Sequence, residues 1–264
     1  MSGFALLFVV ALVVSAIGFY KYVYFISLGY GFSIAAIGAA MLIRFRQSLS
    51  AGPLLQCLLL VVYGCRLGGF LLAREIRSAS YRGAMKREIK DGSGMHLIAK
   101  LGMWGGCALL YACEASPVLF RLQNGAGTDG LCVAGLIVTL CGIALESAAD
   151  LQKSAAKRRN PGRFVDTGLF RLVRCPNYLG EVLTWTGMYL SCLNALRGPW
   201  QWLAATLGYV CIVYIMFGGA RRLELRQNRN YGGDPEYRAY VKKTPILIPF
   251  VPLYSVAKYR WLLG

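Results

Sequence analysis

Charged side chains are scarce in this sequence, and acidic ones are scarcer still. Of the 264 residues only 16% are charged, with 12 acidic against 29 basic residues, while 56% are hydrophobic. A soluble domain carries about 25% charged residues, so the composition argues against an ordinary soluble enzyme, and its high apolar content excludes intrinsic disorder. A formal charge of +17 would suit nucleic acid in a polar chain. In so apolar a chain it favours a membrane protein whose basic residues gather on one side of the bilayer.

The usual motifs of metal and dinucleotide sites are missing as well. The sequence has a single histidine, His96, and none of its nine cysteines forms a Cys-x2-Cys pair. Eight of the cysteines fall in long apolar stretches, where cysteine behaves as a small apolar residue. We therefore expect no protein-bound metal. No Gly-x-Gly-x2-Gly follows a predicted strand, so a Rossmann fold is not expected.

Seven apolar stretches approach the length of about 20 residues that a membrane-spanning helix needs. They run roughly over residues 4–20, 22–43, 52–73, 96–119, 130–149, 178–196 and 199–219. The segments after the first, third, fifth and seventh stretches hold 23 basic residues, and the N-terminus and remaining segments hold 4. This asymmetry predicts a cytosolic C-terminus and an N-terminus outside. We expect an all-α polytopic membrane protein, in which residues 1–264 form one domain and one bundle of about seven transmembrane helices.

Ionisable residues inside such stretches are costly and mark functional sites. Arg66 lies in the third stretch and Glu114 lies deep in the fourth, where it is either a catalytic acid or a structural partner of Arg66. Glu146 and Asp150, four residues apart, share one helical face at the end of the fifth stretch. They form either the wall of a site for a charged ligand or an anchor among lipid headgroups.

The loop from 150 to 177 carries a candidate anion site. Pro176 is a natural first residue for the sixth helix, which puts Asn177 and Tyr178 beside the free N–H groups of its first turn. Such a helix end binds phosphate or carboxylate when arginines flank it, and lipid headgroups would suit it equally. The flanking arginines are Arg163, Arg171 and Arg174.

Tyrosines alternate with basic residues in the C-terminal part of the chain. Tyr231, Tyr237 and Tyr240 lie among Arg222, Arg238, Lys242 and Lys243. This composition suits either a planar base with its phosphates or an aromatic and basic belt at the membrane interface.

The order of these elements resembles that of a known membrane family. The segment from Leu169 to Glu181 resembles the G-L-W-x3-R-H-P-N-Y-x-G-E signature of the family around the steroid 5-alpha-reductases, and more closely a bacterial-type domain of unknown function beside them. Three weaker elements follow the family order, namely Tyr63 to Leu67, Glu146 to Lys153 and Tyr237 to Pro249. The resemblance covers roughly residues 55–255.

The resemblance implies a membrane reductase that uses NADPH to reduce a carbon–carbon double bond conjugated to a carbonyl, in a lipophilic substrate such as a steroid or another lipid. Tyr63 matches the family tyrosine that donates to the carbonyl oxygen, which stabilises the developing enolate, and Arg66 would orient it. In the steroid reductases a glutamate on an early span pairs with this tyrosine. The first two stretches here contain no acid, which leaves Glu114 as the only deep substitute.

The cofactor contacts of the family map onto the loop and the C-terminal part of the chain, so that a cofactor cavity would open to the cytosol between them. Lys157, Arg158 or Arg163 would meet the 2′-phosphate of NADPH. Cys175 stands in place of the histidine of the signature, so a contact from that ring is missing. The full set of predicted cofactor residues is Glu146, Asp150, Lys157, Arg158, Arg163, Arg171, Arg174, Asn177, Tyr178, Glu181, Arg222, Tyr231, Tyr237 and Tyr240.

Two other interpretations remain open. Isoprenylcysteine and phospholipid methyltransferases share a similar R-H-P-x-Y-x-G core and bind S-adenosylmethionine, and a non-catalytic lipid-binding membrane protein is the third possibility. The pairing of Asn177 with Glu181, and Asp150 upstream, favour the reductase. We expect a lipophilic substrate that enters from the bilayer, no nucleic acid and no obligate protein partner, in an endoplasmic reticulum or bacterial inner membrane.

Overall fold

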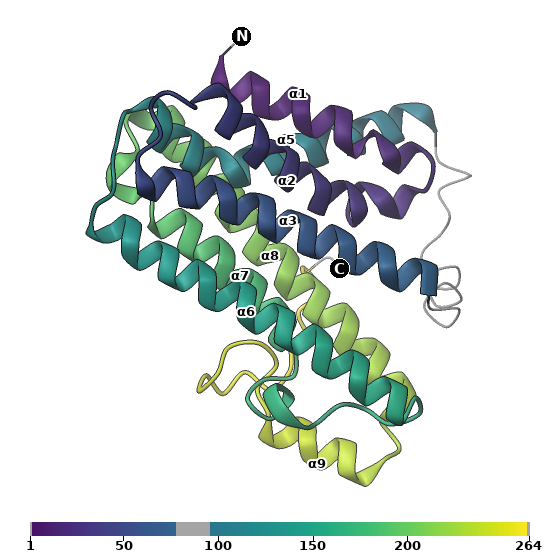
Figure 1. Cartoon of the computed structure of the whole chain (residues 1–264). Helices are drawn as coiled ribbons and strands as arrows, with labels where there is room; N and C mark the ends of the chain where they lie inside the picture. The colour runs from purple at the N-terminus through teal and green to yellow at the C-terminus, as the bar shows by residue number, and fades with distance from the viewer. Residues whose placement is uncertain (1, 78–95, 263–264) are drawn as a thin grey trace. The chain divides into compact units, whose positions relative to one another are not determined.

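The chain is helical throughout the part that the structure, a computed structural model, describes: residues 2–77 and 96–262 (Figure 1). These residues contain eight α-helices, α1 (Gly3–Ser15), α2 (Leu28–Arg44), α3 (Ala51–Arg77), α5 (Leu97–Gln123), α6 (Gly130–Arg159), α7 (Pro176–Leu190), α8 (Gly198–Tyr231) and α9 (Pro235–Lys243). Four short 3₁₀ helices accompany them, η1 (Ala16–Phe19), η2 (Tyr22–Phe25), η3 (Gly168–Arg171) and η4 (Leu193–Ala195). The prediction of an all-α protein is confirmed for these residues.

Five helical segments are long and apolar enough to cross a membrane, which indicates an integral multi-pass membrane protein. They are Tyr22–Arg44, Ala51–Arg77, Leu97–Gln123, Gly130–Arg159 and Gly198–Tyr231, and they match the second to fifth and the seventh predicted stretches. The first predicted stretch forms the shorter apolar helix Gly3–Phe19, and the sixth forms α7, of 15 residues. The count of seven spans therefore stays a prediction. Most of the basic loop expected after the third stretch lies at 78–95, outside the described residues.

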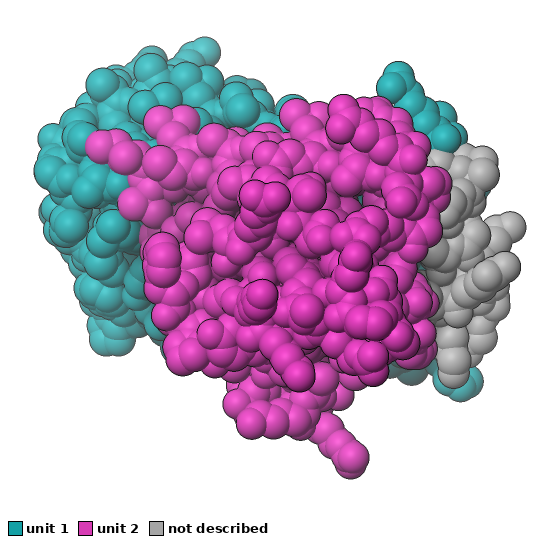
Figure 2. All heavy atoms as spheres, turned by 90° about the horizontal axis from the view of Figure 1, so that it is seen from below, with its two compact units in different colours: residues 1–136, 188–209 teal, residues 137–187, 210–264 magenta. Residues whose placement is uncertain are grey.

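The chain divides into two compact units (Figure 2). The first comprises Met1–Leu136 and Met188–Tyr209, and the second comprises Ile137–Gly187 and Val210–Gly264. Because α6, α7 and α8 each begin in one unit and end in the other, all three connections between the units run through helices. The expectation of one domain over 1–264 stays a prediction.

In the first unit α2 and α3 pack backbone against backbone. A Cβ added to Gly64 would lie 2.4 Å from the carbonyl oxygen of Gly31 and 2.5 Å from the nitrogen of Ala35. A Cβ on Gly31 would in turn lie 2.7 Å from the nitrogen of Gly68. Small residues four apart on each of two helices allow this approach in membrane proteins. Glycine is therefore required at these contacts.

A buried arginine of α5 joins the end of α7 to the turn between α5 and α6 in the first unit. Arg121, at the end of α5, is completely buried, and its Nη1 donates to the carbonyl oxygen of Ser191 at 2.8 Å. Its Nη2 donates to the carbonyl oxygen of Gly127 and to the carboxylate of Asp129. A buried guanidinium is tolerated only when its donors and its charge are satisfied. The end of α7 is thereby held to the turn between α5 and α6.

The core of the second unit lies where the start of α7, the middle of α8 and the chain after α9 meet. We call residues 245–262 the tail. Backbone hydrogen bonds hold it to the segment before α7, from Arg174 N to Pro245 O at 2.8 Å and from Cys175 N to Ile246 O at 3.0 Å. The buried core residues are Val173, Cys175, Leu179, Ala220, Leu223, Ile246, Leu247, Val256 and Leu262. The tail therefore contributes apolar residues to the core instead of hanging free.

Local sequence signals set the bounds of α9. The Asp234 side chain caps the helix by accepting a hydrogen bond from the backbone nitrogen of Glu236, as an N-cap aspartate does. Pro235 follows at the first helical position, where its missing N–H costs nothing. Lys242 and Lys243 occupy the last turn, where positive charge suits the helix dipole.

Candidate functional site

The predicted catalytic tyrosine, Tyr63, is completely buried in the first unit. Its hydroxyl lies 3.4 Å from the hydroxyl of Tyr30 on α2. Each of these tyrosines directly precedes one of the interlocking glycines, Gly64 and Gly31. The backbone contact between α2 and α3 therefore explains why two residues that are 33 positions apart face each other. Tyr30 was not predicted from the sequence, although its Tyr-Gly pair matches that of Tyr63 and was the available signal.

A third tyrosine and the predicted acid lie on α5 in the same unit. The Tyr111 ring packs against the Tyr30 ring with a centroid separation of 5.2 Å, and the Tyr111 hydroxyl donates to the carbonyl oxygen of Phe25 at 2.6 Å. Glu114, one turn further along α5, is 3% exposed. Arg66, one turn after Tyr63 on α3, is half-buried. The roles predicted for Glu114 and Arg66, and their mutual pairing, stay predictions.

In the second unit α6 and α7 touch at the predicted acidic residues. A Cβ added to Gly180 would lie 2.6 Å from the backbone nitrogen of Glu146. This contact sets Glu146, which is 3% exposed, beside the turn of α7 that carries Glu181, which is 7% exposed. Asp150 lies one turn further along α6, and Asn177 lies one turn before Glu181 on α7. Four predicted cofactor residues thus gather around one close helix contact.

Asn177 provides an unused hydrogen-bond acceptor in this group. Its side-chain Oδ1 is buried and has no hydrogen-bond partner. A buried amide oxygen normally has at least one partner, and each exception needs an explanation. A ligand hydroxyl or N–H that reaches the first turn of α7 would satisfy it.

α8 contributes basic residues to the same region. A Cβ on Gly219 would lie 3.3 Å from the ring of Tyr178, so α7 and α8 are in contact there. Arg222, Arg226 and Glu181 lie within electrostatic range of the Tyr178 hydroxyl. Arg226 was not among the residues predicted from the sequence. Its spacing of four from Arg222 places both on one face of α8, which is the signal that could have found it.

The predicted phosphate-binding residues of the loop have partners within the second unit. Lys157 Nζ donates to the carbonyl oxygen of Arg163 at 2.5 Å and to the Tyr231 hydroxyl at 2.8 Å. The Arg163 guanidinium is paired with Asp166 at 3.0 Å and with Glu236. These two carboxylates raise the pKa of Arg163. A phosphate that binds Lys157 or Arg163 would therefore replace these protein partners, whereas Arg158 and Arg171 are exposed.

The tyrosines predicted to hold a planar base pack against Phe164 and one another. The Phe164 ring stacks on Tyr240 at 5.6 Å between centroids and meets Tyr237 edge-on at 5.2 Å. The Tyr240 hydroxyl donates to the carbonyl oxygen of Phe170 at 2.7 Å. Burial raises the pKa of Tyr237 and of Tyr240, so both hydroxyls stay protonated donors. These rings tie the loop to α9, and a stacking role toward a base stays a prediction.

Arg174, predicted as part of the anion site, forms a buried ion pair with Glu224 of α8. The Nη2 and Oε1 atoms are 2.9 Å apart, and the two side chains are 0% and 1% exposed. The other oxygen of Glu224 accepts from the backbone nitrogen of Val256 at 2.9 Å, and Arg174 also donates to the carbonyl oxygen of Tyr254. The charge of Arg174 is thus matched inside the protein, and the pair fixes the tail.

Cys175, which replaces the histidine of the signature, lies in the core of the second unit. It is 1% exposed, and burial raises the pKa of its thiol to about 12. A thiol of this kind is an inert apolar residue and not a nucleophile.

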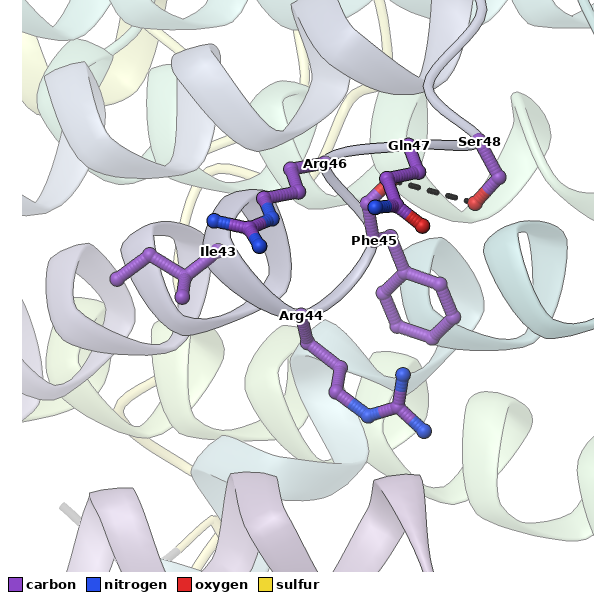
Figure 3. Close-up of a pocket in the computed structure, with 6 residues that line it drawn as sticks. All are labelled: Ile43, Arg44, Phe45, Arg46, Gln47 and Ser48. Atoms are coloured by element: carbon purple, nitrogen blue, oxygen red, sulfur yellow. Dashed lines mark hydrogen bonds between the residues drawn. The ribbon is translucent and has the colours of Figure 1, made fainter.

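Among the described residues, metal-ligand clusters and the surface hollow after α2 add no residue to the predicted site. In residues 2–77 and 96–262, no three His, Cys, Asp or Glu side chains are placed to hold a metal ion. A surface hollow in the first unit is lined by Ile43, Arg44, Phe45, Arg46, Gln47 and Ser48 (Figure 3). Because six consecutive residues form it, the hollow belongs to the turn after α2 and contains none of the predicted site residues.

Comparison with known proteins agrees with the resemblance seen in the sequence motifs. The family described as a protein of unknown function, DUF1295, matches residues 11–244. A curated relative, the steroid 5-alpha-reductase DET2 of Gossypium hirsutum, is 27% identical over 124 residues, which are 45% of this chain and 42% of that protein. The chain thus matches less than half the length of this relative, and no solved structure matches it significantly. The chain belongs to the DUF1295 family and is distantly related to steroid 5-alpha-reductase.

Proposed function

We propose that this protein is an NADPH-dependent membrane reductase that acts on a carbon–carbon double bond conjugated to a carbonyl, in a lipophilic substrate such as a steroid or another lipid. Its distant similarity to a steroid 5-alpha-reductase supports the reductase class. The structural observation that carries the proposal is the contact of Gly180 with Glu146, which gathers the family motif and the buried acidic residues of α6. The proposal needs no nucleic acid and no obligate protein partner.

The residues of the second unit fit NADPH in charge and in hydrogen bonding. The buried Oδ1 of Asn177 lacks a partner and can accept from a hydroxyl, and the Asp150 carboxylate can do the same for a ribose. Arg222, which is exposed, and Lys157 supply positive charge for phosphates. Arg163 can take a phosphate in exchange for Glu236, because guanidinium binds both anions in the same geometry.

Tyr63 is the residue that we assign to the proton. When bound, NADPH supplies a hydride for the carbon that lies β to the carbonyl. The Tyr63 hydroxyl donates a hydrogen bond or its proton to the carbonyl oxygen, which stabilises the negative charge that develops there. The carbonyl is restored when the α carbon takes up a proton, and a proton from water restores the Tyr63 hydroxyl if it has been used. Tyr30, 3.4 Å away, limits the directions in which that hydroxyl can point. Arg66 and Glu114 complete the proposed catalytic group.

We further propose the membrane arrangement that the basic residues predict. The bundle has about seven spans with α1 and α7 among them, the N-terminus outside and the C-terminus in the cytosol. The cofactor enters a cavity from the cytosolic side, and the substrate enters from the bilayer. Either an endoplasmic reticulum or a bacterial inner membrane meets these requirements.

Ligand-dependent thermal stability tests the cofactor class. The detergent-purified protein is heated with NADPH, NADH or S-adenosylmethionine. A ligand that binds only the folded state stabilises it by about 2.7 kcal/mol at a hundredfold excess over its dissociation constant. We expect NADPH to raise the melting temperature most. A shift with S-adenosylmethionine alone would replace the reductase by a methyltransferase, and no shift with any ligand would refute the cofactor site.

Two variants then separate binding from chemistry. Asn177→Ala should weaken the binding of NADPH. Arg197→Ala, which removes an exposed charge elsewhere on the chain, is the control and should leave NADPH binding unchanged. Tyr63→Phe should keep NADPH affinity and lose turnover of an enone such as a 4-en-3-one steroid. Turnover that survives in Tyr63→Phe would remove this residue from the mechanism.

A further inference from the structure

The tail, residues 245–262, is buried on one side and apolar on the other. Its inner side contributes Ile246, Leu247, Val256 and Leu262 to the core of the second unit. On its outer side Phe250 is 93% exposed, Trp261 is 65% exposed and Val251 is 42% exposed. Large apolar side chains that a fold presents together mark a surface that meets something other than water.

Phe250 is held outward by a strained backbone. Its φ of 64° is the single positive value among the non-glycine residues that the structure describes. A bulky residue seldom adopts this region, and such strain persists only where the surroundings impose it. Pro249 and Pro252 enclose the turn and restrict its backbone. The chain therefore maintains a costly conformation that exposes an aromatic ring, which is unfavourable in water and favourable in an apolar layer.

The end of the tail runs along α8, a helix that is long and apolar enough to span a membrane (Figure 1). The Tyr214 hydroxyl of α8 donates to the carbonyl oxygen of Trp261 at 2.6 Å, and their rings stack at 6.1 Å. Arg221 donates to the carbonyl oxygen of Ala257 at 3.2 Å. Tyr214 precedes Arg221 by seven residues, which is about 10 Å along a helix. Because residues 198–220 carry no charge, the tail extends from the charged end of α8 onto its apolar part.

The charges of the tail have one sign. The tail contains two basic residues, Lys258 and Arg260, and no acidic one. Both are exposed, on either side of Tyr259. Aromatic side chains beside lysine and arginine are typical of the boundary between acyl chains and headgroups. Basic residues at that boundary attract anionic lipids.

We propose that the tail is an interfacial anchor that binds the bilayer surface. Phe250 and Trp261 lie in the apolar layer below the headgroups, while Lys258 and Arg260 contact anionic phospholipid headgroups. The anchor holds the chain that follows α9 against α7 and α8. This inference does not depend on the proposed reductase activity.

Quenching by brominated lipid tests the position of Trp261. The full chain is reconstituted into nanodiscs of phosphatidylcholine and phosphatidylglycerol brominated near the headgroup end of the acyl chains. The fluorescence of Trp261 is the difference in emission between wild type and Trp261→Phe. We expect the brominated lipid to quench most of this fluorescence. The difference in emission between wild type and Trp185→Phe gives the fluorescence of Trp185 and is the matched control. Because Trp185 is 2% exposed, its fluorescence should not be quenched by the brominated lipid. Phe250→Trp in the Trp261→Phe background reports in the same way on the turn between Pro249 and Pro252. This substitution leaves the core intact.

Aqueous iodide gives the opposite readout. Quenching of the two reporters by iodide and not by brominated lipid would place the tail in water and overturn the proposal. Protection from both quenchers would mean that a protein surface covers the tail, and would overturn it equally. Replacing phosphatidylglycerol by phosphatidylcholine should weaken the quenching by lipid. The double variant Lys258→Gln, Arg260→Gln should lose this dependence on anionic lipid, and an unchanged dependence would refute the headgroup contact.

Discussion

The buried pair of Arg174 and Glu224 gives the sharpest test of how the second unit is held together. In Glu224→Gln the side chain keeps its shape and loses its charge, so the Arg174 guanidinium stays buried without a counter-ion. Both side chains are at most 1% exposed, so water cannot compensate. Breaking such a pair by removing one charge costs about 3–5 kcal/mol. Because Gln can still accept from the Val256 nitrogen, we expect the lower end of this range, about 3 kcal/mol.

The measurement is the free energy of unfolding in mixed micelles of dodecyl maltoside and dodecyl sulfate, followed by circular dichroism. Trypsin cleavage after Lys258 gives a local readout, because the tail is held by the carboxylate of Glu224 through the nitrogen of Val256. We expect faster cleavage in Glu224→Gln. Glu236→Gln is the matched control, since it removes another carboxylate that pairs with arginine but whose side chain is 67% exposed. Exposed pairs contribute little, so this control should unfold as wild type does.

A double variant decides whether the charge itself is responsible. Arg174→Met combined with Glu224→Leu replaces both ions with apolar groups, which is often close to neutral. We expect it to be more stable than Glu224→Gln. A loss below about 1 kcal/mol in Glu224→Gln, the usual effect of an ordinary substitution, would refute the reasoning. So would a double variant that is less stable than the single one.

Three further predictions follow from contacts in the two units. Gly180→Ala should lower the free energy of unfolding by about 1–3 kcal/mol through overpacking, because its Cβ would lie 2.6 Å from the nitrogen of Glu146. Gly105→Ala is the control and should unfold like wild type, because a Cβ there has nothing within 4 Å. Equal melting temperatures for the two variants would contradict the close contact. Partial burial raises the pKa of Asp129, but hydrogen bonds from Arg121 and a backbone N–H outweigh it and lower the pKa from 3.8 to about 2. The folded state binds this proton more weakly than the unfolded state, so the stabilisation is complete above pH 4 and is lost as the pH falls toward 2. The melting temperature of Asp129→Asn should therefore change less than that of wild type over this range. Melting temperatures of the two proteins that fall in parallel with pH would refute the pairing of Asp129 with Arg121. Cys175 should resist N-ethylmaleimide at pH 8 until detergent denatures the protein, as mass spectrometry can show, because burial raises its pKa to about 12; labelling of the native protein would contradict its burial.

The predicted site residues that lie close together in the structure are those with short, local patterns in the sequence. The motif from Leu169 to Glu181 and the spacing of Glu146 from Asp150 are short patterns, and they led to residues that the structure gathers at the contact of Gly180 with Glu146. Tyr30 and Arg226 were missed, because what makes them notable is a neighbour on another helix.

Charge alone also gave an incomplete description of the arginines. Arg163 and Arg174 look alike in the sequence, as basic residues that flank the start of α7. The structure buries Arg174 completely against Glu224 and leaves Arg163 half-exposed with Asp166 and Glu236. Asp166 is a local neighbour of Arg163, but Glu224 and Glu236 are 50 and 73 residues from the arginines they pair with. Spacing along the chain carries no information about these two distant acids.

The sequence by itself determined that the chain is helical, that it belongs in a membrane and which family it resembles. These properties follow from the length of apolar runs and from short motifs, because helix formation and partition into lipid depend on residues close together in the chain. Only the tertiary structure decided that Tyr30 faces Tyr63, that Glu224 neutralises Arg174 and that the tail lies along α8. Each of these joins residues at least 33 positions apart, and each depends on how closely two backbones can approach, which the packing of the whole unit sets.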